Sequence, residues 1–131
     1  HFLPALIKKI HNLKKNKKKK LVLWGNGMAK REVIYVDDIA NACIYFMNKK
    51  IKENTVNVGT GKDLTIKKYA ELMLKLIIPE RKIKIVYDRS KPNGTPRKVL
   101  DISLAKKYGW KPKTKLKDSI LKAYKSYLRE I

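Results

Sequence analysis

The sequence predicts an α/β fold with a small, partly parallel sheet and flanking helices. Segments with apolar residues at helical spacing alternate along the chain with short runs of valine, leucine and isoleucine. Glycines, prolines and capping residues separate these segments, as they do at the ends of helices and strands. Alternating strands and helices favour parallel pairing. The length of 131 residues, with 44% hydrophobic residues, suits a single domain with its own core.

The first element is expected to be a helix that begins near Pro4, since proline is favoured in the first turn. The run from Lys14 to Lys20, broken only by Asn16, is expected to be a charged loop that ends it. The residues expected on its apolar face are Leu3, Leu6, Ile7, Ile10 and Leu13.

Two strands are expected next, over residues 21–24 and 32–35, with a turn at Gly25-Asn26-Gly27 between them. A helix capped by Asp37 or Asp38 then follows. The residues expected on its inner side are Ile39, Cys43, Phe46 and Met47.

A third strand is expected over 55–58, ended by Gly59-Thr60-Gly61. Thr65 is expected to cap a helix, and a fourth strand is expected over 83–87. The inner side of that helix should carry Ile66, Tyr69, Ala70, Met73, Leu76 and Ile77.

The chain should close with a short helix ended by Gly109 and a terminal helix from about Leu116. The residues expected inside the terminal helix are Ile120, Tyr124, Tyr127 and Leu128.

Composition limits the classes of function. Lysine and arginine give a net charge of +22, which attracts polyanions such as nucleic acid, anionic lipid or phosphorylated substrates. However, the lysines are spread along the whole chain, which favours a solvated surface over a nucleic-acid face. Cys43 is the only cysteine, so we expect no internal disulfide, no metal cluster and a reducing, cytoplasmic setting. No apolar run is long enough to span a membrane, and no signal peptide is apparent.

The segment Ser90-Lys91-Pro92-Asn93-Gly94-Thr95-Pro96-Arg97-Lys98, followed by Asp101, is the most informative one in the chain. Its prolines restrict φ and its glycine tolerates positive φ, so the loop should be pre-shaped. A pre-shaped loop that presents three cations suits a multiply charged anion such as a diphosphate.

Other motifs are weaker. Gly25-Asn26-Gly27 begins a dinucleotide-binding pattern, but Lys30 stands at its third glycine position and no helix follows directly. Tyr-x-x-x-Lys occurs at Tyr45/Lys49 and Tyr87/Lys91, as chance predicts in a chain so rich in both residues. His11 is expected to face solvent, and no hydrolase triad is apparent. Trp24 could stack on a base or could be buried in the core.

Together, these segments resemble the C-terminal part of the GDP-L-fucose synthase family of extended short-chain dehydrogenase/reductases. The resemblance runs from His1 to the end of the chain. Its motifs are His1-Phe2-Leu3-Pro4-Ala5-Leu6, Leu23-Trp24-Gly25-Asn26-Gly27, Arg31 to Asp38, Asn57-Val58-Gly59-Thr60-Gly61, Ser90 to Lys98 with Asp101, and Gly109-Trp110-Lys111-Pro112. The Lys-Pro-x-Gly-Thr-Pro-Arg-Lys loop is the most specific of them.

The resemblance implies an enzyme that epimerises C3 and C5 of GDP-4-keto-6-deoxy-D-mannose and then reduces C4 with NADPH. His1 falls on a histidine that lies beside the cofactor and acts as an acid in epimerisation; its cysteine partner is not Cys43. The resemblance assigns five further residues to substrate binding. They are Lys9 at the nucleotide, Trp24 at the guanosine end, Arg31 and Lys98 at the diphosphate, and Asn93 near the ribose.

Two positions depart from the family pattern. Lys9 stands where arginine is common, and Asn93 stands where aspartate is usual. A lysine keeps the charge but loses the bidentate fork, so its contact with the nucleotide should be weaker.

The resemblance also implies that residues 1–131 form a single substrate-binding region. The NADP-binding domain, the catalytic serine and the Tyr-x-x-x-Lys pair of the family precede the segment seen here. We therefore expect the full-length protein to be a homodimeric cytoplasmic enzyme and this chain alone to be inactive. We expect no metal, no membrane partner and no specific nucleic-acid partner. Two alternatives stay open: a lobe of another sugar-nucleotide epimerase or dehydratase, and a basic nucleic-acid-binding domain.

Overall fold

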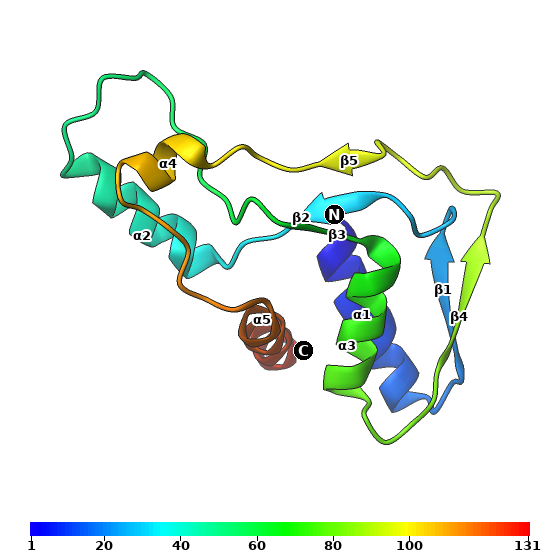
Figure 1. The fold of residues 1–131 in the computed structure, drawn as a ribbon. Coiled ribbons are helices and arrows are strands. Elements are labelled where there is room, and N and C mark those ends of the chain that lie inside the picture. The colour runs from blue at the N-terminus through cyan, green and yellow to red at the C-terminus, as the bar shows by residue number, and fades with distance from the viewer.

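The computed structural model describes residues 1–131 and contains two small sheets with five helices. Strand β1 (Lys20–Trp24) pairs in parallel with β4 (Lys84–Asp88), from Lys20 opposite Lys84 to Trp24 opposite Asp88. Helices α1 (Phe2–Lys15) and α3 (Ile66–Ile77) lie side by side against this pair (Figure 1). The fold is thus the α/β class with a partly parallel sheet that the sequence predicts.

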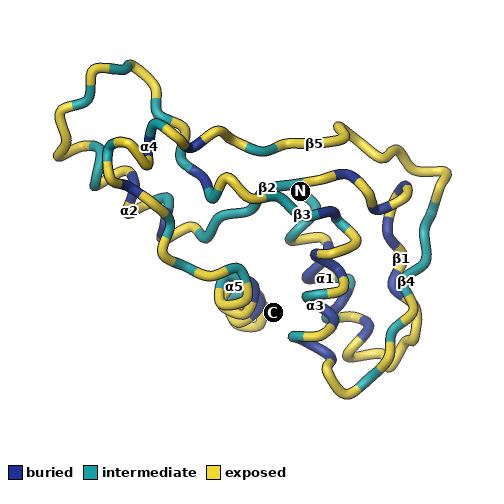
Figure 2. Tube along the Cα trace, in the orientation of Figure 1, coloured by how far each residue is buried: buried dark blue, intermediate teal, exposed yellow.

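The main core forms where α1, α3 and β1 meet. The face of α1 that points inward is the predicted one, and β1 alternates exposed and buried residues, so that Leu21 and Leu23 point inward. Figure 2 shows that the buried positions concentrate along these elements. The residues with almost no exposed surface include Ile10, Leu21, Tyr69, Met73, Ile78 and Ile120.

Capping residues act as predicted at two places. The Thr65 side chain accepts a hydrogen bond from the Lys68 amide at 3.1 Å and starts α3. Gly109, with φ +88°, follows α4 (Ser103–Lys107) and turns the chain toward α5 (Leu116–Glu130).

A second sheet consists of three short strands. Strand β2 (Lys30–Glu32) is central, with β3 (Asp63–Thr65) antiparallel on one side and β5 (Arg97–Lys98) parallel on the other. Neither β3 nor β5 is predicted by the sequence, because each is too short to show a period. The predicted strand over 32–35 is wrong in its bounds, since pairing stops at Glu32.

Helix α2 (Val36–Met47) differs most from prediction. Neither Asp37 nor Asp38 caps it; the residue before the helix is Tyr35, which makes no side-chain cap. The Asp38 carboxylate is buried and accepts hydrogen bonds from the amides of Lys113 and Thr114 at 3.2 and 3.0 Å. This pairing with a distant loop satisfies the buried charge, as burial requires.

The inner face of α2 is also displaced from the predicted one. Cys43 and Met47 are exposed, and the residue buried at the centre of the helix is Ala42, which packs with Ala105 and Trp110. The predicted strand over 55–58 is wrong, because that segment pairs with no strand.

Two expectations for α5 and α1 also need correction. Leu128 is exposed, although Ile120 and Tyr124 are buried as predicted. His11 does not face solvent: its ring is half-buried, and its Nδ1 lies 3.1 Å from the Tyr124 Oη. No helix combines the length and apolar character that crossing a membrane would require.

The β3–β2–β5 sheet should lose stability in acid. The Arg97 guanidinium donates to Asp63 from Nε at 2.6 Å and from Nη2 at 3.3 Å, which holds the pKa of the Asp63 carboxyl below its usual 3.8. A lowered folded-state pKa contributes stability that is complete above the unfolded value and disappears as pH falls through the folded one.

We expect D63N to flatten the acid limb of a plot of urea midpoint against pH below about pH 4. The lowered pKa values of Asp88, Asp101 and Glu53 should keep some acid dependence. E130Q, a neutralisation at the exposed end of α5, is the matched control and should leave the slope unchanged. Equal slopes for D63N and the unaltered chain would contradict the prediction.

Candidate functional site

All six residues that the family resemblance assigns to the site line one cavity of about 730 Å³. They come from four places in the fold: the start and middle of α1, the end of β1, the β2–β5 pair and the loop before β5. These six residues are His1, Lys9, Trp24, Arg31, Asn93 and Lys98. Phe2, Leu6, Leu23 and Ile66 supply apolar wall, so the cavity combines an apolar body with cations at fixed points.

Arg31 and Lys98 form the cationic part of the cavity. They stand directly opposite each other in the parallel β2–β5 pairing, so both side chains leave the sheet on the same face. Neighbouring strands are about 4.8 Å apart, and like charges placed directly opposite destabilise a sheet. An anion bound between them would remove that repulsion.

The Arg31 guanidinium is oriented before any ligand arrives. Its Nη1 donates to the carbonyls of Lys30 at 2.6 Å and Thr95 at 2.7 Å. A side chain at Gly94 would begin 3.2 Å from Arg31 Nη2. Because arginine has five N–H donors, its remaining donors stay available for an oxyanion.

Tyr69 holds the backbone of Arg31 through a hydrogen bond. Its buried hydroxyl donates to the Arg31 carbonyl at 2.8 Å, and burial raises its pKa to about 12. The hydroxyl therefore stays protonated, and thus a donor, at physiological pH. Its ring also packs against Phe2, with the ring centroids 5.3 Å apart.

Asn93 joins the loop before β5 to the glycine turn after β1. Its Oδ1 accepts a hydrogen bond from the Asn26 amide at 2.7 Å. Gly25, with φ +65°, lets the two segments approach, since a Cβ there would lie 2.1 Å from Asn93 Oδ1. The amide oxygen is thus occupied by the protein, which leaves the Asn93 NH₂ group for a ligand.

Trp24 is not a core residue: 60% of it is exposed, at the end of β1. The Nζ atoms of Lys9 and Lys91 lie 5.8 and 5.7 Å from the centre of its ring, within cation–π range. Lys9 also donates to the Val22 carbonyl at 3.0 Å. Lys9 is thereby held beside an exposed aromatic surface on which a base could stack.

His1 is exposed at the start of α1, where its side chain makes no capping bond, and it lines the cavity beside Phe2. His11, the other histidine, does not line the cavity.

Glu32 also lines the cavity, although sequence reasoning did not select it. Two signals in the sequence could have identified it: its position next to Arg31 and its place in the Arg31 to Asp38 motif.

The two Tyr-x-x-x-Lys pairs lie outside this cavity. Lys49 does contact Tyr45, with its Nζ donating to the Oη at 3.1 Å, but that hydroxyl donates to the Tyr108 carbonyl at 2.8 Å. The contact thus ties α2 to the end of α4.

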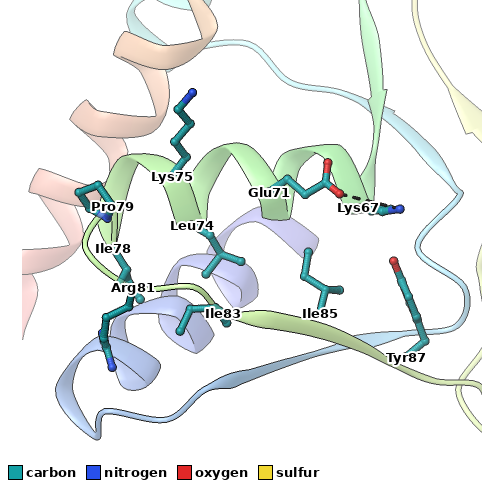
Figure 3. A pocket seen from close by; sticks show the side chains of 10 residues that line it. All are labelled: Lys67, Glu71, Leu74, Lys75, Ile78, Pro79, Arg81, Ile83, Ile85 and Tyr87. Atoms are coloured by element: carbon teal, nitrogen blue, oxygen red, sulfur yellow. Dashed lines mark ion pairs between the residues drawn. The ribbon is translucent and has the colours of Figure 1, made fainter.

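A separate hollow of about 570 Å³ lies between α3 and β4 (Figure 3). Leu74, Ile83 and Ile85 line its interior, and Lys67 forms an ion pair with Glu71 at 3.9 Å on its rim. None of the residues proposed for anion binding lines this hollow.

The fold defines the class of protein. The structure superposes on MlghC, a GDP-mannoheptose C4 reductase from Campylobacter jejuni with NADP bound, with a TM-score of 0.80 and 34% identity. The match covers 98% of this chain and 45% of that one. The chain is a small α/β domain that matches the C-terminal part of extended short-chain epimerase/reductase structures.

The sequence comparisons are more specific. GDP-L-fucose synthase 1 of Arabidopsis thaliana is 38% identical over 131 residues, which is all of this chain and 40% of its own length. GDP-L-fucose synthase of Escherichia coli (strain K12) is 36% identical over 137 aligned residues, covering 98% of this chain and 42% of its own length.

Residues 1–59 match the NAD dependent epimerase/dehydratase family. Beyond this partial match, the chain is a homologue of the GDP-L-fucose synthases over its whole length. It spans about two fifths of the length of these relatives.

The contact between Gly25 and Asn93 can be tested by substitution. Gly25→Ala should lower the free energy of unfolding by roughly 2–4 kcal/mol, because it combines a strained positive φ with a collision against a loop. Gly94→Ala, at φ +72°, meets only the flexible end of Arg31 and should cost about 1–2 kcal/mol. Urea unfolding measures both; equal losses would show that the close approach of the two segments contributes nothing.

Proposed function

We propose that this chain is the sugar-nucleotide-binding part of an NADPH-dependent epimerase/reductase that converts GDP-4-keto-6-deoxy-D-mannose to GDP-L-fucose. The observation that supports the proposal best is the in-register pair of Arg31 and Lys98 on the wall of one cavity with Trp24. Two adjacent cations suit a diphosphate, and a half-exposed indole suits a base.

Different residues along the cavity bind different parts of the substrate. Arg31 and Lys98 take the diphosphate, Trp24 and Lys9 take the guanosine end, and the Asn93 amide lies near the ribose. The sugar then extends toward His1 at the start of α1. A pre-oriented Arg31 guanidinium favours binding because less side-chain entropy is lost than with a free side chain.

The chemistry follows from the ketone at C4. A carbonyl acidifies the C–H bonds on both neighbouring carbons, so one site can remove a proton from C3 or C5 and return one to the opposite face. His1 acts as the acid that returns a proton. NADPH, when bound, supplies the hydride that reduces C4 after epimerisation.

The nicotinamide cofactor is held mainly by a domain outside these 131 residues. This chain has no glycine-rich strand–turn–helix of its own to approach a pyrophosphate. The exposed side of α2 is a suitable surface for a further domain to pack against, because it carries an apolar stripe. The stripe is made of Val36, Ala40, Cys43, Ile44 and Met47.

Nucleotide binding tests the proposal. By calorimetry, GDP should bind this chain more tightly than ADP or free pyrophosphate. Arg31→Ala should weaken GDP binding by about 1.5–3 kcal/mol, because it removes charge-assisted hydrogen bonds. Trp24→Ala should weaken it by about 1–3 kcal/mol through lost stacking.

Lys68→Ala, on the exposed side of α3, removes the same charge outside the cavity and is the control for Arg31→Ala. If GDP bound no better than pyrophosphate, the proposed nucleotide site would be wrong.

Catalysis should require more than this chain. We expect the 131 residues mixed with NADPH and GDP-4-keto-6-deoxy-D-mannose to oxidise no NADPH above background, because the hydride donor lacks its binding domain. A full-length GDP-L-fucose synthase in the same spectrophotometric assay is the positive control. Turnover by this chain alone would show that the cofactor-binding site lies within it.

A further inference from the structure

Strand β5 brings Lys98 to the cavity, yet it has little pairing to hold it. Its two residues pair with β2 only at Lys30–Arg97 and Arg31–Lys98. On the entry side, the Lys30 amide donates to the Pro96 carbonyl at 2.8 Å. On the exit side, the ladder ends at Lys98. A two-residue strand bearing a cation opposite another cation needs an additional restraint.

The Glu32 carboxylate provides that restraint. Its Oε2 accepts a hydrogen bond from the Leu100 amide at 2.7 Å, two residues after Lys98. Its Oε1 accepts from the amides of Thr60 at 2.5 Å and Gly61 at 2.7 Å, and from the Thr60 hydroxyl at 3.2 Å. One side chain thus joins the end of β2 to the chain that leaves β5 and to the loop before β3.

The backbone is shaped to admit this carboxylate. A Cβ at Gly59 would lie 2.4 Å from Glu32 Oε1, so the loop can approach only because that residue is glycine. A carboxylate that accepts several backbone N–H bonds is held strongly, since charge-assisted hydrogen bonds are the stronger kind.

We infer that Glu32 is a positioning residue, which sets the spacing of Lys98 from Arg31 so that both cations reach one diphosphate group. The inference rests on the proposed function, since it concerns the same nucleotide site. Glu32 acts through its hydrogen bond to the Leu100 amide, just after β5, rather than by touching the ligand.

The sign of its effect distinguishes positioning from electrostatics. Glu32 lines the same cavity and carries a negative charge, so its neutralisation alone would strengthen the binding of an anion. If Glu32 positions β5, the same neutralisation weakens binding, because Lys98 is no longer held beside Arg31.

Glu32→Gln provides the test. A glutamine keeps the shape and can keep one oxygen on the Thr60 and Gly61 amides, but its NH₂ group then faces the Leu100 amide, donor against donor. By calorimetry, we expect about tenfold weaker GDP binding and little change for guanosine, which has no phosphate.

D101N is the matched control. The Asp101 carboxylate accepts a hydrogen bond from the Ser103 amide at 2.8 Å just before α4, so D101N removes the same charge from the same segment of the chain. Its GDP affinity should stay within about twofold of the unaltered chain. A loss of general stability would weaken GDP and guanosine alike, and would also appear in the thermal unfolding of both variants.

The two proposals can fail separately. If the unaltered chain does not prefer GDP, the proposed function is wrong; amide hydrogen exchange then still tests Glu32. Faster exchange in E32Q of the Leu100 amide and of the β2–β5 amides, but not of α1, would support positioning. If E32Q binds GDP as tightly or more tightly, or if exchange at β5 is unchanged, Glu32 does not position Lys98.

Discussion

Arg31 and Lys98 face the same side of a sheet from neighbouring strands, and this repulsive arrangement explains much of the structure around it. Two cations at strand spacing oppose the pairing that brings them together. Hydrogen bonds from several parts of the fold hold the two residues in place. Two carbonyls orient the Arg31 guanidinium, the Tyr69 hydroxyl supports its backbone, and Glu32 restrains the segment after Lys98. An anion between the two cations, as we propose, would remove their repulsion.

The position of a cation distinguishes the proposed binding residues from the other positive charges of the chain. The chain carries +22 in total, but most of its lysines are solvated and are not placed opposite other cations around a cavity. On the other face of the β3–β2–β5 sheet, Arg97 is neutralised by Asp63. What marks Arg31 and Lys98 is therefore their location on the wall of a cavity with an apolar body and an exposed indole.

Figure 1 shows α1, α3, β1 and β4 at one end of the molecule and α2 and α4 at the other. At one end, α1, α3 and β1 bury a continuous core and shape the cavity. At the other end, α2 packs inward mainly through Ala42 against Ala105 and Trp110, and leaves apolar side chains on its outer side.

The sequence by itself determined the elements whose signals are local. The period of apolar residues in α1, the Thr65 cap of α3 and the short apolar run of β1 are each local to one segment, and all three elements appear in the structure. The family resemblance assigned six residues to a site, and the structure places all six on the wall of one cavity.

Only the tertiary structure decided what depends on distant partners. Strands β3 and β5 exist because β2 lies between them, and residues 55–58 stay unpaired because no strand lies beside them. Asp38 does not cap α2 but accepts hydrogen bonds from two amides about 75 residues away. His11 lies within hydrogen-bond distance of Tyr124. Glu32 accepts hydrogen bonds from backbone amides in two loops that are distant in the sequence. A polar side chain chooses among hydrogen-bond partners that chain folding brings together, and no local pattern encodes that choice.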